Sequence, residues 1–354
     1  MRSPRSFTGP AGTRDGWLAR FPASHFAFVM ATGIVSIAAD LQKVPLVPGA
    51  LFALNLAAYA MLLAITLARL LRHPSALFRD LADHAAGPTF LTMVAATSVL
   101  GAQFASMTAF RGIALVLWLW AALLWVVLLY GFVLAATLAR RKPPIQQGLG
   151  GAWLLVTVST ESLCVLGTAV ADLLPRPELG IFACVCLFLL GGMFYAVLIA
   201  LILYRWLFLE MTAAMLAPPY WINMGAVAIA TLAGADLLLH AKTAGTPDFR
   251  PFLTALTTGF WAAATWWVPL LAALTAWRHA AGKIRLAYDP QYWSMVFPLG
   301  MYTAATAAFA RVTGYDFLLP IPKVFVWLAL AAWLAAFAGL LLRLGHATLA
   351  AARH

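Results

Sequence analysis

Residues 179–207, LGIFACVCLFLLGGMFYAVLIALILYRWL, decide the fold of this chain. The stretch has one charged side chain, Arg205, and no serine or threonine, so a helix built from it is apolar on every face. A helix needs about 20 apolar residues to cross a bilayer, at about 1.5 Å of rise per residue. Helices that are apolar all round suit lipid. The stretch therefore predicts a transmembrane helix.

The whole chain shares this apolar character. Of its 354 residues, 64% are apolar and 10% are charged, and its mean hydropathy is +0.89. Soluble domains have about 45–50% apolar and about 25% charged residues. A water-soluble fold cannot hide this much apolar surface, because surface grows too quickly relative to volume. We expect an all-α integral membrane protein, with the lipid bilayer as its solvent.

Apolar stretches separated by charged, proline and glycine clusters predict ten transmembrane helices. Their approximate ranges are 22–40, 48–71, 85–105, 112–139, 149–173, 179–207, 218–239, 252–277, 290–311 and 321–345. We therefore expect one transmembrane domain over 22–347, with tails at 1–21 and 348–354. The first apolar stretch lacks an obvious small-residue cleavage site, so we expect a retained first helix rather than a cleaved signal peptide.

The distribution of Lys and Arg predicts the orientation. Counted together with the adjoining helix ends, the N-terminus, the loops after the even-numbered helices and the C-terminus hold 16 of these residues, and the other loops hold 7. Basic loops mark the cytoplasmic side, so we expect a multi-pass protein of the plasma (inner) membrane with both termini in the cytoplasm. This bias also explains the net charge of +11, and scattered basic loops indicate no nucleic-acid partner.

A weak internal repeat joins the odd-numbered helices. They start near Pro22, Pro88, Gly150, Pro219 and Pro290, at intervals of 66, 62, 69 and 71 residues. All five would cross in the same direction, which predicts five parallel hairpins. The odd helices contain 16 Ser and Thr residues and the even helices 7. Two explanations stay open: small polar residues that let helices pack closely, or an inner ring of odd helices that lines a pathway.

Glu161 is the most informative residue, because it lies near the middle of the fifth predicted helix. A carboxylate at the bilayer centre costs several kcal/mol unless it is protonated, paired or hydrated. Thr157, Glu161, Cys164 and Thr168 share one helix face, which would line an aqueous path. The alternative is a protonated Glu161 that is hydrogen-bonded to neighbouring helices.

Two further residues have functional and packing interpretations. His25 opens the first helix, where a single histidine is more often an interfacial packing residue than a ligand or proton carrier. Pro298 removes a backbone hydrogen bond from the ninth predicted helix and tends to kink it. The neighbouring Phe297 could plug a pore, although a membrane phenylalanine more commonly faces lipid or another helix.

Enzymatic chemistry is not expected. The sequence has no His-Glu-x-x-His motif, no paired intramembrane acids and no Walker or Rossmann glycine motif. Cys164, Cys184 and Cys186 lie in apolar segments and are interpreted as small core residues rather than disulfides or metal ligands. We therefore expect no catalytic residue, no metal and no cofactor.

Four segments resemble the tellurite-resistance/C4-dicarboxylate transporter family, within the voltage-dependent and slow anion channel-like superfamily. They are FPASHFAFVMATGIVS at 21–36, SLCVLG at 162–167, PPYWINMG at 218–225 and YWSMVFPLG at 292–300. The family includes bacterial tellurite-resistance proteins, yeast malate permeases and sulfite pumps, and the plant guard-cell slow anion channel. The resemblance extends over the chain from the first predicted helix to the tenth.

The resemblance implies five helical hairpins around a central pore, usually in a homotrimer, and transport of small anions without a cofactor. It places Phe297, followed by Pro298, at the pore constriction. Candidates along the path are His25, Thr32, Ser36, Thr92, Thr157, Glu161, Thr168, Asn223 and Ser294. Many relatives have glutamine where this chain has Glu161. A fixed negative charge opposes anion conduction, which favours a proton-linked carrier with Glu161 as the coupling residue, or a neutral Glu161.

The sequence therefore predicts a transporter or channel for a small anion such as a C4-dicarboxylate, sulfite or a related oxyanion. The alternative is a membrane scaffold or an orphan intramembrane enzyme whose polar helices serve packing. Asp40, Asp172 and Asp236 lie near the outer ends of three odd-numbered helices. They would make the outer mouth acidic if they face it.

Overall fold

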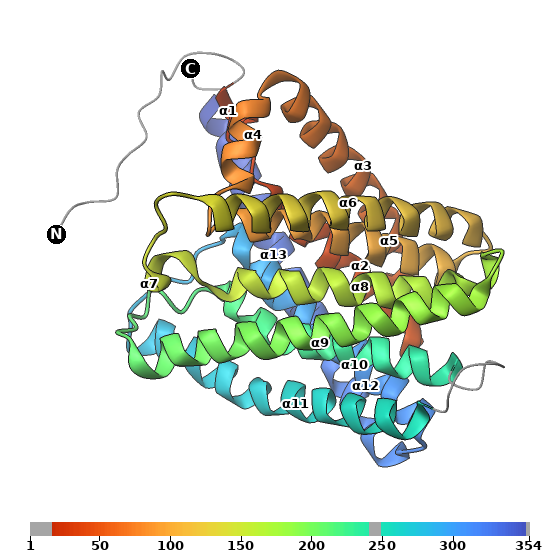
Figure 1. Ribbon diagram of the computed structural model, residues 1–354. Coiled ribbons are helices and arrows are strands. Elements are labelled where there is room, and N and C mark those ends of the chain that lie inside the picture. The colour runs from red at the N-terminus through yellow and green to blue at the C-terminus, as the bar shows by residue number, and fades with distance from the viewer. Residues whose placement is uncertain (1–15, 241–248, 352–354) are drawn as a thin grey trace.

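The computed structural model describes residues 16–240 and 249–351, and the described chain is helical with no β-strand (Figure 1). The long helices are α2 (Phe26–Leu41), α3 (Val47–Arg72), α5 (Thr92–Met107), α6 (Arg111–Leu138), α8 (Leu155–Val170), α9 (Pro177–Phe208), α10 (Ile222–His240), α11 (Arg250–Ala280), α12 (Trp293–Thr313) and α13 (Pro320–Ala351). Short helices are α1 (Gly16–Ala19), α4 (Pro74–Leu81) and α7 (Ile145–Gly148). Each long helix overlaps one of the ten predicted stretches.

Within the described residues, nine helical segments are long and apolar enough to cross a membrane. The remaining long helix, α12, has 21 residues but a more polar composition that includes Ser294, Tyr302 and Arg311. It is buried among its neighbours along most of its length. Its low hydropathy follows from that position, because a helix that touches protein on all sides does not have to be apolar towards lipid.

The predicted tails fall only partly within the described residues. Residues 1–15 and 352–354 lie outside them, while α1 occupies part of the expected N-terminal tail and α13 continues to Ala351, beyond the expected boundary at 347. Helix α4, which follows α3 after a break at His73, is not among the helices predicted from the sequence. Arg69 of α3 joins these elements, since its guanidinium binds Asp80 of α4 at 2.5 Å and the Ala19 carbonyl at 2.8 Å.

The long helices fall into an inner and an outer set. Helices α2, α5, α8, α10 and α12 form a closed ring of contacts in that order, with α12 returning to α2. Helices α3, α6, α9, α11 and α13 each pack on the inner helix that precedes them and on the next inner helix. In the most apolar stretch of each inner helix α2, α5, α8 and α10, 67–89% of the residues are buried. In the corresponding stretches of the outer helices, 22–28% of the residues are buried.

Every inner helix begins with a 3₁₀ turn. The turns are η1 (Ala23–His25), η2 (Gly87–Leu91), η3 (Gly151–Leu154), η5 (Pro218–Trp221) and η6 (Pro290–Tyr292). They touch one another in a second closed ring, η1 to η2, η3, η5, η6 and back to η1. Gly151 shows how tight this ring is, because a Cβ there would lie 2.6 Å from the carbonyl carbon of Pro219. The five starts of the sequence repeat coincide with these turns.

Each outer helix also reaches the inner helix of the following hairpin through an aromatic hydrogen bond. The pairs are Tyr59 with Thr97, Trp125 with Thr160, Tyr195 with the Asn223 carbonyl, Trp261 with Thr306, and Trp333 with Thr32. Their heavy-atom distances run from 2.9 to 3.4 Å. Such bonds satisfy hydroxyl and indole groups that would otherwise be stranded away from water. They lock each hairpin to the next.

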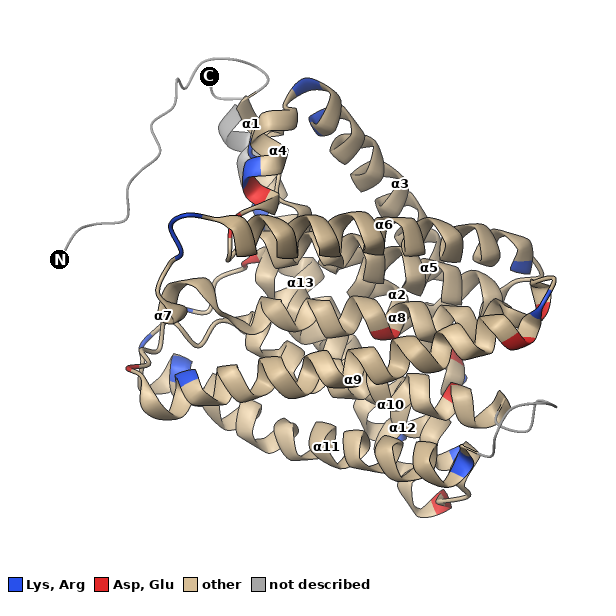
Figure 2. Cartoon of the chain, in the orientation of Figure 1, with Lys and Arg blue, Asp and Glu red and all other residues tan. Residues whose placement is uncertain are grey.

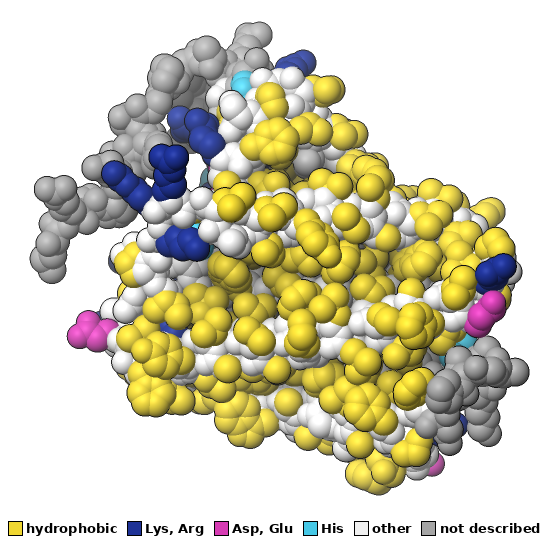
Figure 3. Space-filling view, viewed as in Figure 1, with side chains coloured by type: hydrophobic (Ala, Val, Ile, Leu, Met, Phe, Trp, Pro, Cys, Tyr) yellow, Lys and Arg dark blue, Asp and Glu magenta, His cyan; other side chains and the backbone are white. Residues whose placement is uncertain are grey.

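The outer surface matches a lipid environment. Figure 2 shows Lys, Arg, Asp and Glu gathered near helix ends, with an acidic position midway along α8, where Glu161 is the charged residue of that helix. Figure 3 shows apolar side chains covering the visible faces of α6, α9 and α11. On these three helices, the side chains of Leu134, Phe182, Val197 and Trp266 are more than half exposed. An apolar belt between charged ends is the surface that a bilayer requires.

Candidate functional site

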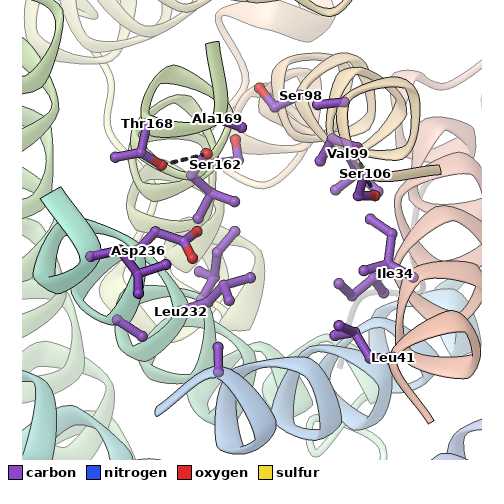
Figure 4. A pocket seen from close by; sticks show the side chains of 18 of the residues that line it. Ile34, Leu41, Ser98, Val99, Ser106, Ser162, Thr168, Ala169, Leu232 and Asp236 are labelled. Atoms are coloured by element: carbon purple, nitrogen blue, oxygen red, sulfur yellow. Dashed lines mark hydrogen bonds between the residues drawn. The ribbon is translucent and has the colours of Figure 1, made fainter. Parts of the chain in front are cut away.

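A cavity of about 510 Å³ opens between the C-terminal halves of the inner helices (Figure 4). All five inner helices contribute to its wall, and α6 adds Arg111. The lining is mostly apolar, from residues such as Ile34, Val99, Ile229 and Met301. Its polar lining residues are Ser98, Ser106, Arg111, Ser162, Thr168, Asp236, His240 and Arg311.

The cavity ends at a layer of buried apolar side chains. Its deepest lining residues are Ile34, Ser98, Ser162, Ile229 and Met301, one from each inner helix. One helical turn nearer the N-terminal ends, the same faces carry Met30, Val94, Val158, Gly225 and Phe297. All five are buried, and the four that have side chains are 0% exposed. This layer separates the cavity from the N-terminal ends of the ring.

Phe297 is the largest side chain of that layer. It lies four residues before Met301, which lines the cavity, so the two share a face of α12. On the neighbouring helix α10, a Cβ added at Gly225 would lie 3.4 Å from Phe297 Cδ1 and 2.8 Å from Pro298 Cγ. Gly225 therefore leaves the space that the Phe297 ring and Pro298 occupy. Pro298 has no N–H, so it cannot donate a helical hydrogen bond to the Ser294 carbonyl.

Charged groups stand at the open end of the cavity. Arg111 forms a two-pronged ion pair with Asp172, at 2.7 and 2.6 Å, and also donates to the Ala169 carbonyl at 2.7 Å. Arg311 of α12 is exposed and donates to the Leu41 carbonyl at 3.5 Å. The inner helices turn their C-terminal carbonyl ends toward this mouth, and these ends carry negative partial charge. Asp172 neutralises Arg111, so Arg311 is the arginine that offsets that charge.

The three aspartates expected at the outer mouth have different environments. Asp172 is paired with Arg111, and Asp40 is exposed at the end of α2 and absent from the cavity lining. Asp236 of α10 lines the cavity, and its carboxylate turns into it (Figure 4). Among the described residues, no hydrogen bond or ion pair reaches this carboxylate, while the Asp236 backbone carbonyl lies 3.0 Å from His240 Nδ1.

Glu161 does not lie on the cavity wall, which differs from the position that the sequence analysis gives it. The cavity-lining residues of α8 are Ser162, Val165, Thr168 and Ala169. The Glu161 side chain points instead toward α9, where a Cβ added at Gly191 would lie 2.7 Å from its Cδ and closer still to Oε1. Glu161 is 0% exposed, and neither carboxylate oxygen has a hydrogen-bond partner among the described residues. A bare charge is very costly in such a place.

Thr168 is the predicted path residue that lines this cavity. Two others contact neighbouring elements: Thr32 accepts from Trp333 at 3.0 Å, and Ser36 donates to the Pro48 carbonyl at 2.9 Å. The rest lie on the N-terminal side of the Phe297 layer: His25, Thr92, Thr157, Asn223 and Ser294.

Four of those residues, His25, Thr92, Thr157 and Asn223, differ in their contacts. Thr92 donates to the Ala23 carbonyl at 3.0 Å, which ties α5 to η1. The His25 ring stacks on Phe21 with 4.6 Å between centroids. The Thr157 hydroxyl and the Asn223 amide are buried with no partner among the described residues.

The sequence analysis did not single out Ser98, Ser106, Ser162, Arg111, His240 or Arg311. Ser162 and Ala169 are small residues seven apart on one face of α8, a spacing that places them together on a helix. That pattern could have indicated the cavity face, but the more polar stripe through Glu161 obscured it. Within the described residues, no group of three or more His, Cys, Asp and Glu side chains is placed to hold a metal ion.

Comparisons with known proteins agree with the resemblance found in the sequence. A family model described as voltage-dependent anion channel matches residues 20–341. A Mycobacterium tuberculosis protein, named an uncharacterized membrane protein, is 33% identical over 147 residues, which cover 42% of this chain and 75% of the relative. A Methanocaldococcus jannaschii protein, named an uncharacterized transporter, is 21% identical over 333 residues, 90% of this chain and 94% of the relative.

Proposed function

Since this chain belongs to the voltage-dependent anion channel family, we propose that it carries small anions across a membrane through the centre of its inner helix ring. The family points to a transporter or channel rather than to an enzyme. The observation that carries the proposal is the cavity of about 510 Å³, which all five inner helices line. A cavity on the axis of such a ring is expected in a transporter or channel, and a scaffold does not require it.

The proposed path crosses the bilayer along the axis of ten transmembrane helices arranged as five hairpins. In this proposal α12 also spans the membrane, in addition to the nine apolar segments of the described chain. It enters the cavity, passes the Phe297 layer and continues between the N-terminal halves of the inner helices. Phe297 and Pro298 form the constriction. The Thr157 hydroxyl and the Asn223 amide are buried with no partner among the described residues, and their contact with a passing anion stays a prediction.

The substrate class that fits is a small oxyanion, such as a C4-dicarboxylate or sulfite. Binding sites for small molecules have volumes of about 300–1,000 Å³, so the cavity holds such an anion with part of its water. We propose a homotrimer in the plasma (inner) membrane as the working form. The proton coupling through Glu161 that the sequence favours stays a prediction. Glu161 and Asp236 can be compared in the same transport assay.

Purified protein in liposomes tests the proposed function. We expect uptake of at least one labelled anion from a panel of chloride, nitrate, sulfite, succinate and malate, above the level of empty liposomes. Uncharged solutes of similar size, such as glycerol, should not be taken up. Failure of every anion, with protein that is folded and inserted, would refute anion transport.

The proposed topology predicts opposite locations for two reporters. A fusion after the C-terminus should report the cytoplasm, and a fusion in the loop between α10 and α11 should report the other side, because ten spans separate the two cytoplasmic termini. Paired phosphatase and fluorescent-protein fusions measure this directly. Both fusions on one side would mean that α12 does not cross, leaving nine spans.

A further inference from the structure

We propose that Asp236 is the proton-binding group of the cavity, and that its protonation admits the anion. This inference rests on the proposed transport of anions and adds the residue through which pH acts. A proton from the solution at the cavity mouth binds the Asp236 carboxylate, and an anion then enters a cavity from which one negative charge has been removed. Proton and anion therefore bind cooperatively.

Asp236 has the position that a proton-binding group of the cavity needs. Asp236 lines the cavity, its carboxylate turns into it, and no described group pairs with it. A sphere of 510 Å³ is about 10 Å across, so an anion anywhere in the cavity lies within about that distance of the carboxylate. Two like charges this far apart repel enough to weaken binding about tenfold at the effective dielectric of a protein.

The charge balance of the lining changes when Asp236 is protonated. Besides Asp236, the charged or titratable groups in the lining are Arg111 of α6, His240 of α10 and Arg311 of α12. Further such groups lie on the elements around α10: Asp172, which is paired with Arg111, Asp40 at the end of α2, Cys164 on α8, Cys184 on α9 and Arg250 at the start of α11. Asp172 neutralises Arg111. An ionised Asp236 cancels Arg311, and a protonated Asp236 leaves the lining with one net positive charge.

Glu161 cannot play this part from its position in the structure. Its carboxyl group lies between α8 and α9, against Gly191, and it does not line the cavity. His240 is the other titratable group on the wall, one turn from Asp236 on the same helix. The test therefore compares Asp236, Glu161 and His240 in the same assay.

The experiment measures chloride uptake into proteoliposomes at pH values from about 3.5 to about 8, a range in which carboxyl groups and histidines titrate. Chloride is the probe because it does not bind protons in this range, so any pH dependence belongs to the protein. In the wild-type protein, we expect uptake to fall about tenfold as pH rises. Asp236→Asn should keep uptake near its acidic maximum at all pH values.

Three variants serve as controls. Asp236→Glu should retain the pH dependence, because it retains the carboxyl group, whereas Glu161→Gln and His240→Asn should retain it because Asp236 is intact. The inference is overturned if Asp236→Asn keeps the wild-type pH profile, or if Glu161→Gln or His240→Asn removes it. The Glu161→Gln outcome also decides the coupling that the sequence predicts for Glu161.

A binding measurement separates failure of this inference from failure of the proposed function. The thermal stability of the purified protein is followed with and without chloride at acidic and neutral pH. Chloride should stabilise wild-type protein more at acidic pH, because a ligand that binds only the folded state raises its stability. Asp236→Asn should remove that difference. Absence of transport with this pattern intact contradicts the proposed function alone, while a difference that persists in Asp236→Asn contradicts the role of Asp236.

Discussion

Replacing Phe297 by alanine should raise anion flux about tenfold or more. The Phe297 ring is 0% exposed and fills the apolar layer beneath the cavity, against Gly225. An apolar constriction resists ions because they must shed water to pass it, and ion dehydration costs several kcal/mol. Removing about 1.4 kcal/mol of that barrier already gives a tenfold faster rate. The measurement is the initial rate of anion uptake per folded protein in liposomes.

The controls separate an opened path from a damaged protein. A buried Phe→Ala change costs about 3–5 kcal/mol in protein cores, so the folded amount of each variant must be measured. Phe309 is on the same helix and 1% exposed, but its ring packs against Trp261 and Tyr315. Phe309→Ala should leave flux per folded protein at the wild-type level, and Phe297→Leu should give an intermediate flux. Equal flux in wild-type protein and well-folded Phe297→Ala would remove the constriction from the path.

Much of the architecture could be predicted from the sequence, because lipid and protein demand different side chains. The stretches over 179–207 and 321–345 are apolar on all sides, and they form the outer helices α9 and α13. Hydroxyl-rich stretches form the inner helices α2, α5, α8 and α12, but α10 is an inner helix with a single threonine, and the outer helix α11 has five. The ninth predicted helix, α12, also falls short of the apolar composition of the others. Its position inside the ring explains why its polarity is tolerated.

The facing of α8 could not be predicted, since its polar residues surround the helix. Hydroxyl groups in a membrane helix often bond to the carbonyls of their own helix, and these do: Thr160 to Val156, Ser162 to Ser159 and Thr168 to Val165. A polar side chain with such a bond can point to any side. The polarity of the stripe through Glu161 therefore does not identify the face toward the cavity. Contact with Gly191, a residue of another helix, fixes the direction of Glu161.

Replacing Gly191 by alanine should destabilise the protein by about 1–3 kcal/mol, the usual cost of overpacking a tight contact. The added Cβ would lie 2.7 Å from Glu161 Cδ, inside the contact distance of two carbon atoms. Glu161→Ala should remove that collision, so Gly191→Ala should cost much less in the Glu161→Ala background. The measured quantity is the stability of the four proteins in detergent or lipid, by thermal or denaturant unfolding.

The size of the coupling between the two changes tests where Glu161 points. Residues in direct contact show coupling of about 0.5–3 kcal/mol, and separated residues show nearly additive effects. Glu161→Gln keeps the shape of the side chain, so it should not relieve Gly191→Ala. Gly192→Ala is the matched control, because its Cβ would meet Phe260 Cζ at 2.9 Å rather than Glu161. Additive effects at positions 161 and 191 would contradict this placement. They would favour a Glu161 side chain on the cavity face of α8, where the sequence predicts a proton-coupling role.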